Sequence, residues 1–223
     1  MIITEQKAFA ELLSLLERHQ SVFVVGCGVC ATTWRTGGEP EVKALLSELS
    51  AAGKQSTGWT ITAEACCDAR LTRRILKQSS TALKITDAIV VMACGAGTQT
   101  VASLVELPVY PGLNTIGLSQ IQSLSLALER CRLCGDCMLA ETAGICPVAR
   151  CPKGLMNGPC GGYQDGKCEV DRTQDCAWVL IYERLQTLGQ EARLAIISEP
   201  KDWSRMRSPR VADKKAAQLA AKE

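Results

Sequence analysis

The chain has thirteen cysteines and a single histidine, His19, in 223 residues. Cross-links or metal sites in such a chain must be built mainly from cysteine. The first residues, Met1–Glu11, include acidic side chains and lack the apolar centre of a secretory signal. We therefore expect a cytoplasmic protein, whose thiols are kept reduced and whose cysteine clusters serve metal or redox chemistry. The odd number of cysteines also fits poorly with full disulfide pairing, so metal binding is favoured over disulfides.

Composition narrows the class of protein further. Hydrophobic residues make up 47% and charged residues 22% of the chain, and the net charge of +2 is too small to predict a nucleic-acid partner. No run approaches the ~20 apolar residues of a membrane helix, so no membrane partner is expected. The single histidine disfavours histidine-based zinc hydrolases and two-histidine acid–base catalysis. A Ser-His-Asp site would need His19, which we predict at a polar helix end.

Residues 1–125 show alternating helix-like and strand-like segments. Helices are predicted at 9–16, 40–49 and 68–76, and strands at 22–25, 59–63, 88–93, 109–110 and 114–116. This alternation is typical of an α/β domain with a small parallel sheet, similar to flavodoxin or Rossmann domains. A helix is also expected from residue 119 to 130, with Ile121, Leu124, Leu126 and Leu128 available for packing.

Residues 126–197 are predicted to form a loop-rich, cysteine-rich domain that ends in a helix over 176–188. Its eight cysteines are Cys131, Cys134, Cys137, Cys146, Cys151, Cys160, Cys168 and Cys176. The overlapping CxxCxxC triple at 131–137 and the Cys-Pro steps at Cys146 and Cys151 are typical of ferredoxin-like iron–sulfur ligation. Eight thiolates would hold two [4Fe–4S] clusters. Zinc knuckles and structural thiols are the alternatives, and the spacing leaves open which cysteine serves which cluster.

The last segment, residues 198–223, is a basic tail with seven Lys or Arg against four Asp or Glu. Within it, the stretch 203–210 places three arginines near Trp203 and is a candidate docking segment. Such tails are more often simply mobile.

Five further cysteines follow predicted strands in the first domain. Cys27 and Cys30 follow the first strand, Cys66 and Cys67 the second, and Cys94 the third. The carboxyl ends of parallel strands share one edge, where such folds bind ligands. Cys27, Cys30, Cys94 and one of Cys66 or Cys67 are therefore a possible site for a third [4Fe–4S] cluster or zinc. Buried free cysteines are the plainer interpretation.

A nucleotide site is a weaker alternative for the same loop. Residues 26–31 match G-x-G-x-x-A, and Glu64 could take the place of the ribose-binding acid. Glu64 lies more than thirty residues downstream, whereas the fingerprint expects the acid about twenty residues on.

The string CRLCGDC…GICPVARCPKGLMNGPCGGYQDGKCEVDRTQDCAWVLIYERL resembles the C-terminal domain family of methylenetetrahydrofolate reductases. More specifically, the chain resembles the iron–sulfur partner subunit of that reductase in acetogenic and related anaerobic bacteria. The most specific elements are NGPCGG, CEV and C-x-W-x-x-I-Y-x-R-L, which cover about residues 128–188. The blocks GCGVCAT…TGGE and ACGAG nearer the N-terminus resemble the same subunit. Relatives often carry a further cysteine where Trp34 stands here, which leaves the first domain's ligand set open.

The resemblance implies an essential, non-catalytic subunit of a one-carbon, Wood–Ljungdahl type oxidoreductase complex. Two [4Fe–4S] clusters would deliver electrons to a flavin-containing catalytic subunit that reduces methylene-tetrahydrofolate to methyl-tetrahydrofolate. The electron donor would be a ferredoxin, or a heterodisulfide-reductase-like or dehydrogenase module. The rival functions are a zinc-stabilised scaffold without redox activity and an NAD-binding oxidoreductase.

Overall fold

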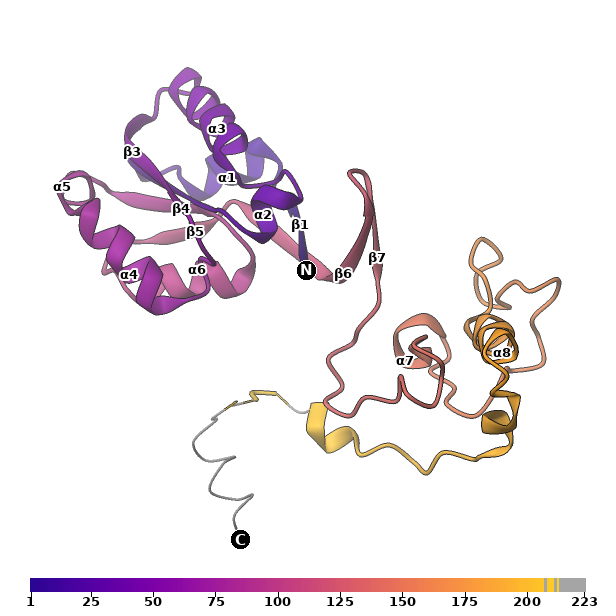
Figure 1. Ribbon diagram of the computed structural model, residues 1–223. Coiled ribbons are helices and arrows are strands. Elements are labelled where there is room, and N and C mark those ends of the chain that lie inside the picture. Colours follow the sequence, from indigo (N-terminus) through magenta and orange to yellow (C-terminus); the bar gives the residue numbers. More distant parts are fainter. Residues whose placement is uncertain (207, 211, 213–223) are drawn as a thin grey trace, which may run out of the picture. The chain divides into compact units, whose positions relative to one another are not determined.

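The protein is described by a computed structural model that covers residues 1–206, 208–210 and 212 (Figure 1). The chain divides into two compact units, unit 1 at Met1–Leu128 and unit 2 at Glu129–Glu223. Each unit has its own buried core and is treated separately below.

Unit 1 contains a four-stranded parallel sheet, which confirms the predicted α/β class. Its strands run in the order β3-β2-β4-β5 and span Gln55–Thr62, Ser21–Cys27, Ala88–Met92 and Val109–Pro111. Every residue of β2 and β4 is buried, as expected for central strands covered on both faces.

Helices cover both faces of this sheet. Their bounds are α1 Phe9–Leu15, α2 Cys30–Thr33, α3 Glu39–Ala51, α4 Ala69–Gln78, α5 Ser80–Leu83 and α6 Gly95–Ala102. Figure 1 shows α1 and α3 on one face and α4 and α6 on the other. The chain passes from β2 to β3 on one side and then crosses to β4 on the other. The carboxyl ends of β2 and β4 therefore form the point at which the strand order reverses, where open α/β sheets bind ligands.

A second, three-stranded sheet has the order β1-β6-β7, with strands at Ile2–Gln6, Leu113–Ser123 and Leu126–Glu129. Strand β1 pairs antiparallel with β6, with Ile2 opposite Leu118. The predicted helix over 119–130 is therefore wrong: this segment forms the end of β6, a turn at Leu124 and Ser125, and β7. Leu124, Leu126 and Leu128 recur every second residue, which is the period of a strand.

Unit 2 is mostly irregular, with short helices and one longer helix. Their bounds are α7 Pro147–Arg150, α8 Ala177–Thr187, and the 3-10 helices η1 Glu191–Ala195 and η2 Trp203–Met206. Helix α8 confirms the predicted terminal helix, and its buried stripe consists of Trp178, Ile181 and Leu185. Leu188, predicted on the same stripe, is 45% exposed because the helix ends before it.

The core of unit 2 is small. Four buried residues form it: Cys176, Trp178, Ile181 and Leu185. The indole Nε1 of Trp178 donates to the carbonyl oxygen of Leu155 at 3.0 Å, which fixes the loop before the glycine-rich segment onto α8. Within the described residues, no helix has both the length and the apolar character to cross a bilayer.

Candidate metal centres

All thirteen cysteines lie in the described part of the chain and are free thiols. As the side chains are placed, no three Cys, His, Asp or Glu residues among those described converge closely enough to hold a metal ion. Ligation at any of these sites therefore requires thiol side chains to rotate toward a common centre. The question is which thiols the fold brings to one place.

Four cysteines of unit 2 line a single small cavity of about 20 Å³. They are Cys151, Cys160, Cys168 and Cys176. Much of the remaining lining is apolar and consists of Pro152, Pro159, Val170, Ala177 and Trp178. Lys153 and Glu169 complete the lining. Four thiolates are the donor set of a [4Fe–4S] cluster, so the four cysteines fit the group predicted from the sequence by number and type.

Backbone hydrogen bonds position these four cysteines locally. Cys176 is the N-cap residue of α8, and its amide donates to the carbonyl oxygen of Gly166 at 2.7 Å. The amide of Cys168 donates to the carbonyl oxygen of Gln174 at 2.9 Å. Gly166 has φ +75°, a conformation that glycine adopts at little cost, so this turn favours glycine.

A charged pair lies beside the Cys160 thiol, and the sequence did not reveal it. The thiol donates to Oε2 of Glu169 at 3.1 Å, and Nζ of Lys153 contacts the same oxygen at 2.5 Å. Lys153, and to a lesser degree Cys160, lower the pKa of the Glu169 carboxyl. A Cβ at Gly162 would lie 2.2 Å from this Glu169 oxygen, so the last glycine of NGPCGG leaves room for the carboxylate.

The other four cysteines of unit 2 lie on the loop 131–137 and at the start of α7. The amide of Leu133 donates to Sγ of Cys131 at 3.4 Å, and the thiol of Cys134 donates to the carbonyl oxygen of Asp136 at 3.4 Å. Cys146 is the N-cap residue of α7. An amide directed at a ligand sulfur is the kind of contact that tunes iron–sulfur sites.

Lys201, Arg205 and Arg210 lie against this loop. Lys201 has a side chain only 4% exposed; its Nζ lies 3.3 Å from Oδ2 of Asp136 and also donates to the Asp136 carbonyl. Arg210 donates to the carbonyl oxygen of Leu133. A Cβ at Gly135 would lie 3.0 Å from Cβ of Arg205. Part of the predicted docking segment is thus engaged within unit 2, and residue 207 lies outside the described residues.

In unit 1, the five cysteines follow the carboxyl ends of β2, β3 and β4, as the sequence predicted. Cys27 ends β2, Cys30 begins α2, and Cys94 is the N-cap residue of α6. Burial raises the pKa of the Cys67 thiol, and the thiols of Cys94, Cys27 and Cys30 raise it further. These four sulfurs are therefore near enough to interact electrostatically.

Cys66 differs from its neighbour. It is 1% exposed and belongs to the main core of unit 1. Its thiol is directed at the carbonyl oxygen of Gly97 at 3.8 Å, and its own carbonyl accepts from Oγ1 of Thr72 at 2.8 Å. Burial, with a smaller contribution from Cys27, raises the pKa of the Cys66 thiol to about 12.

The nucleotide alternative receives little support from the geometry. The loop 26–31 leads into α2, which is only four residues long, whereas a dinucleotide site needs a long helix starting there. A Cβ at Gly28 would lie 2.4 Å from the Thr62 carbonyl oxygen, so this glycine permits close approach to β3. His19, predicted as solvated, is half-buried, and its Nε2 lies 2.8 Å from the Tyr110 hydroxyl.

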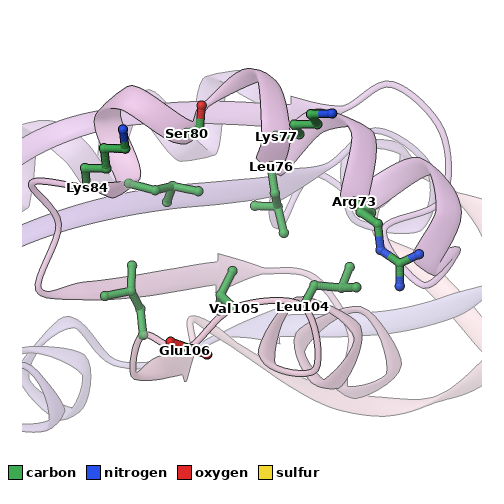
Figure 2. Close-up of a pocket in the computed structure, with 10 residues that line it drawn as sticks. Arg73, Leu76, Lys77, Ser80, Lys84, Leu104, Val105 and Glu106 are labelled. Carbon is green, nitrogen blue, oxygen red and sulfur yellow. The ribbon is translucent and has the colours of Figure 1, made fainter.

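Unit 1 also has an open groove of about 470 Å³ that contains no cysteine (Figure 2). Its apolar lining comes from α4, α5 and the segment 104–107, and Arg73, Lys77 and Lys84 stand around it. Since α4 starts near Cys67 and runs away from it, the groove lies toward the opposite edge of the sheet. It is separate from the cysteine clusters.

Comparison with known families gives one match. Residues 110–204 match the family described as "Methylene-tetrahydrofolate reductase C terminal". The match begins in β5 and extends through all eight cysteines of unit 2. No curated protein and no solved structure matches the chain.

Proposed function

Because the segment 110–204 belongs to the methylene-tetrahydrofolate reductase C-terminal family, we propose that this chain is the iron–sulfur electron-transfer subunit of such a reductase. It would serve a flavin-containing catalytic subunit that converts methylene-tetrahydrofolate to methyl-tetrahydrofolate, a step that takes two electrons and two protons. Bound to the thiolates of unit 2, two [4Fe–4S] clusters would supply one-electron transfer between a donor protein and that flavin. The donor would be a ferredoxin, or a heterodisulfide-reductase-like or dehydrogenase module.

The observation that carries the proposal is the cavity lined by four cysteines in unit 2. It supports a division of the ligands that the spacing alone left open. Cys151, Cys160, Cys168 and Cys176 would hold one cluster. The remaining four, Cys131, Cys134, Cys137 and Cys146, would hold the other, with the CxxCxxC triple on one loop.

The chain's other residues have supporting roles around the first of these sites. Trp178 and Pro159 form part of the apolar lining beside the four thiols. Cys160 must lose its proton to solvent to become a ligand, and this would end the hydrogen bond that its thiol donates to Glu169. Lys153 then balances part of the negative charge that four thiolates bring.

The first test is the metal content of the strictly anaerobic full chain, with acid-labile sulfide and an EPR spectrum after dithionite reduction. About eight irons per chain supports two clusters, and about twelve supports a further cluster in unit 1. Zinc without iron would reject the electron-transfer function and leave the zinc-stabilised scaffold.

Double variants test the division of the ligands. Loss of one ligand is expected to remove its whole cluster, about four irons. Cys160→Ser combined with Cys168→Ser should therefore lose about four irons, because both residues serve one cluster. Cys134→Ser combined with Cys160→Ser should lose about eight. Equal losses from the two double variants would contradict the division.

Replacing Cys134 by Ala tests the electron path itself. The variant complex should lose donor-dependent reduction of methylene-tetrahydrofolate, because one cluster on the path is missing. Turnover with an artificial dye at the catalytic subunit's own flavin should persist. If dye turnover falls equally while the complex stays assembled in gel filtration, the relay function is wrong.

A further inference from the structure

We propose that Cys27, Cys30, Cys67 and Cys94 form a four-thiolate site for a thiophilic metal at the carboxyl edge of the parallel sheet, and that Cys66 is not a ligand. The metal would be a single Zn²⁺ or a [4Fe–4S] cluster, both of which four cysteines can hold. The site lies entirely in unit 1. It is therefore independent of the proposed function, which rests on the thiols of unit 2.

The sheet topology brings these cysteines together. Cys27 pairs with Thr62 in the parallel register of β2 and β3, and Gly26 pairs with Met92 of β4. The loops that follow these strands therefore start side by side. Because β2 and β4 flank the point where the strand order reverses, their loops diverge and leave space for a ligand. Cys30 and Cys67 are 37 residues apart in the sequence and Cys67 and Cys94 are 27 apart, yet the fold brings them to one edge.

The turn after β3 gives the adjacent residues Cys66 and Cys67 different surroundings, and this determines which of them is the proposed ligand. The amide of Asp68 donates to the carbonyl oxygen of Ala65 at 2.9 Å, which places Cys66 and Cys67 at the two central positions of a turn. Cys66 is 1% exposed and enters the core, where its thiol is directed at the carbonyl oxygen of Gly97 in α6. Cys67 stays exposed on the side of Cys94. Cys67 is therefore the one of the two that a metal can reach from solvent.

The four thiols range from buried to exposed, so a metal could reach the site from solvent. Cys27 is buried, Cys30 and Cys94 are half-buried, and Cys67 is exposed. A cation placed among these sulfurs would attract all four thiolates. Cys66, by contrast, is 1% exposed and belongs to the main core of unit 1.

Binding involves no oxidation or reduction of the protein. The four thiols release four protons to solvent, and four sulfur–metal bonds form, at about 2.3 Å for zinc. Because Cys67 is exposed, its side chain can change rotamer without disturbing the core of unit 1. A cation then offsets the four thiolate charges that would otherwise repel one another.

The experiment compares Cys67→Ser with Cys66→Ser in the anaerobically purified full chain, by zinc, iron and sulfide content. Cys67→Ser should lose about one zinc or about four irons per chain relative to wild type. Cys66→Ser, one residue away, should retain the full metal content. Cys94→Ser should match Cys67→Ser. Far-UV circular dichroism checks that each variant is folded, which is expected for Cys67 and Cys94 because neither is buried.

The metal that each variant loses or retains decides whether the proposed site exists and which metal it holds. Zinc loss identifies a zinc site and iron loss an iron–sulfur site, and either supports the proposal. Full metal retention in Cys67→Ser and Cys94→Ser would overturn it, as would equal loss in a folded Cys66→Ser. Cys151→Ser reports unit 2 alone. A wild-type chain whose only metal is zinc, lost in Cys67→Ser, would reject the proposed electron transfer and keep this site.

Discussion

Cys66 and Cys67 are adjacent and chemically identical, yet the fold gives them opposite surroundings. One thiol is 1% exposed against α6, and the other is open to solvent. The sequence could place the pair after a strand but could not choose between them, because the choice depends on which side of the turn faces α6. Contacts of Cys66 with Gly97, thirty-one residues away, make that choice.

Gly97 is predicted to be intolerant of a methyl group although it lies in a helix. A Cβ there would lie 2.9 Å from Cβ of Ala93 and 3.2 Å from Cβ of Cys66. Gly97→Ala should therefore lower the free energy of unfolding by about 1–3 kcal/mol through overpacking, against the usual helix preference for alanine. Urea unfolding measures the change.

Gly117→Ala is the matched control for this substitution. Gly117 lies in β6, and no atom lies within 4 Å of the position its Cβ would take. Its effect should be close to zero. A Gly97→Ala chain as stable as wild type would mean that Cys66 is not held as tightly as its contacts with α6 imply.

Among the helices and strands, the sequence predicted those that have a local hydrophobic pattern. It missed the strand that forms only by pairing with a segment far along the chain. The apolar runs of β2 and β4 and the stripe of α8 are visible without any fold. Strand β1 was not predicted, because its pairing partner β6 lies more than a hundred residues later. The four cysteines around the cavity of unit 2 follow no regular spacing, so only the loops' folding reveals them.

Helix α8 is predicted to hold the core of unit 2. Ile181 is fully buried on it, so Ile181→Ala should destabilise unit 2 by about 2–5 kcal/mol through lost burial and a cavity. Hydrogen exchange of the α8 amides should accelerate accordingly. Leu188→Ala, at the exposed end of the same helix, is the control and should cost less than half as much. Equal effects would place the core elsewhere.

The whole molecule combines two units with very different cores. Unit 1 buries two central strands completely, whereas the main core of unit 2, among the residues described, consists of four side chains. Small domains with so little apolar burial usually depend on metals or cross-links. The cysteines of unit 2 are free thiols, and the proposed clusters would supply such a link.

Removal of metal should therefore affect the two units unequally. After treatment with an iron chelator and oxidant, followed by thiol reduction, unit 2 should become sensitive to protease within residues 131–175, while unit 1 stays resistant. Limited proteolysis with mass spectrometry measures this, with the untreated holoprotein as the control. Unchanged resistance of unit 2 in the metal-free chain would show that its protein contacts are sufficient.

The pairing of β1 with β6 limits when β1 can fold during synthesis of the chain. Oγ1 of Thr4 contacts Oγ1 of Thr36 at 2.6 Å, and Nε2 of Gln6 donates to the Thr36 carbonyl, so β1 supports the loop that follows Cys30. That strand can dock only when its partner Leu118 has left the ribosome, because the pairing closes a very long loop. The parallel sheet can form earlier. The loop that follows Cys30 therefore gains its support from β1 only after β6 is made, later than the strands β2, β3 and β4, whose last residue is Met92.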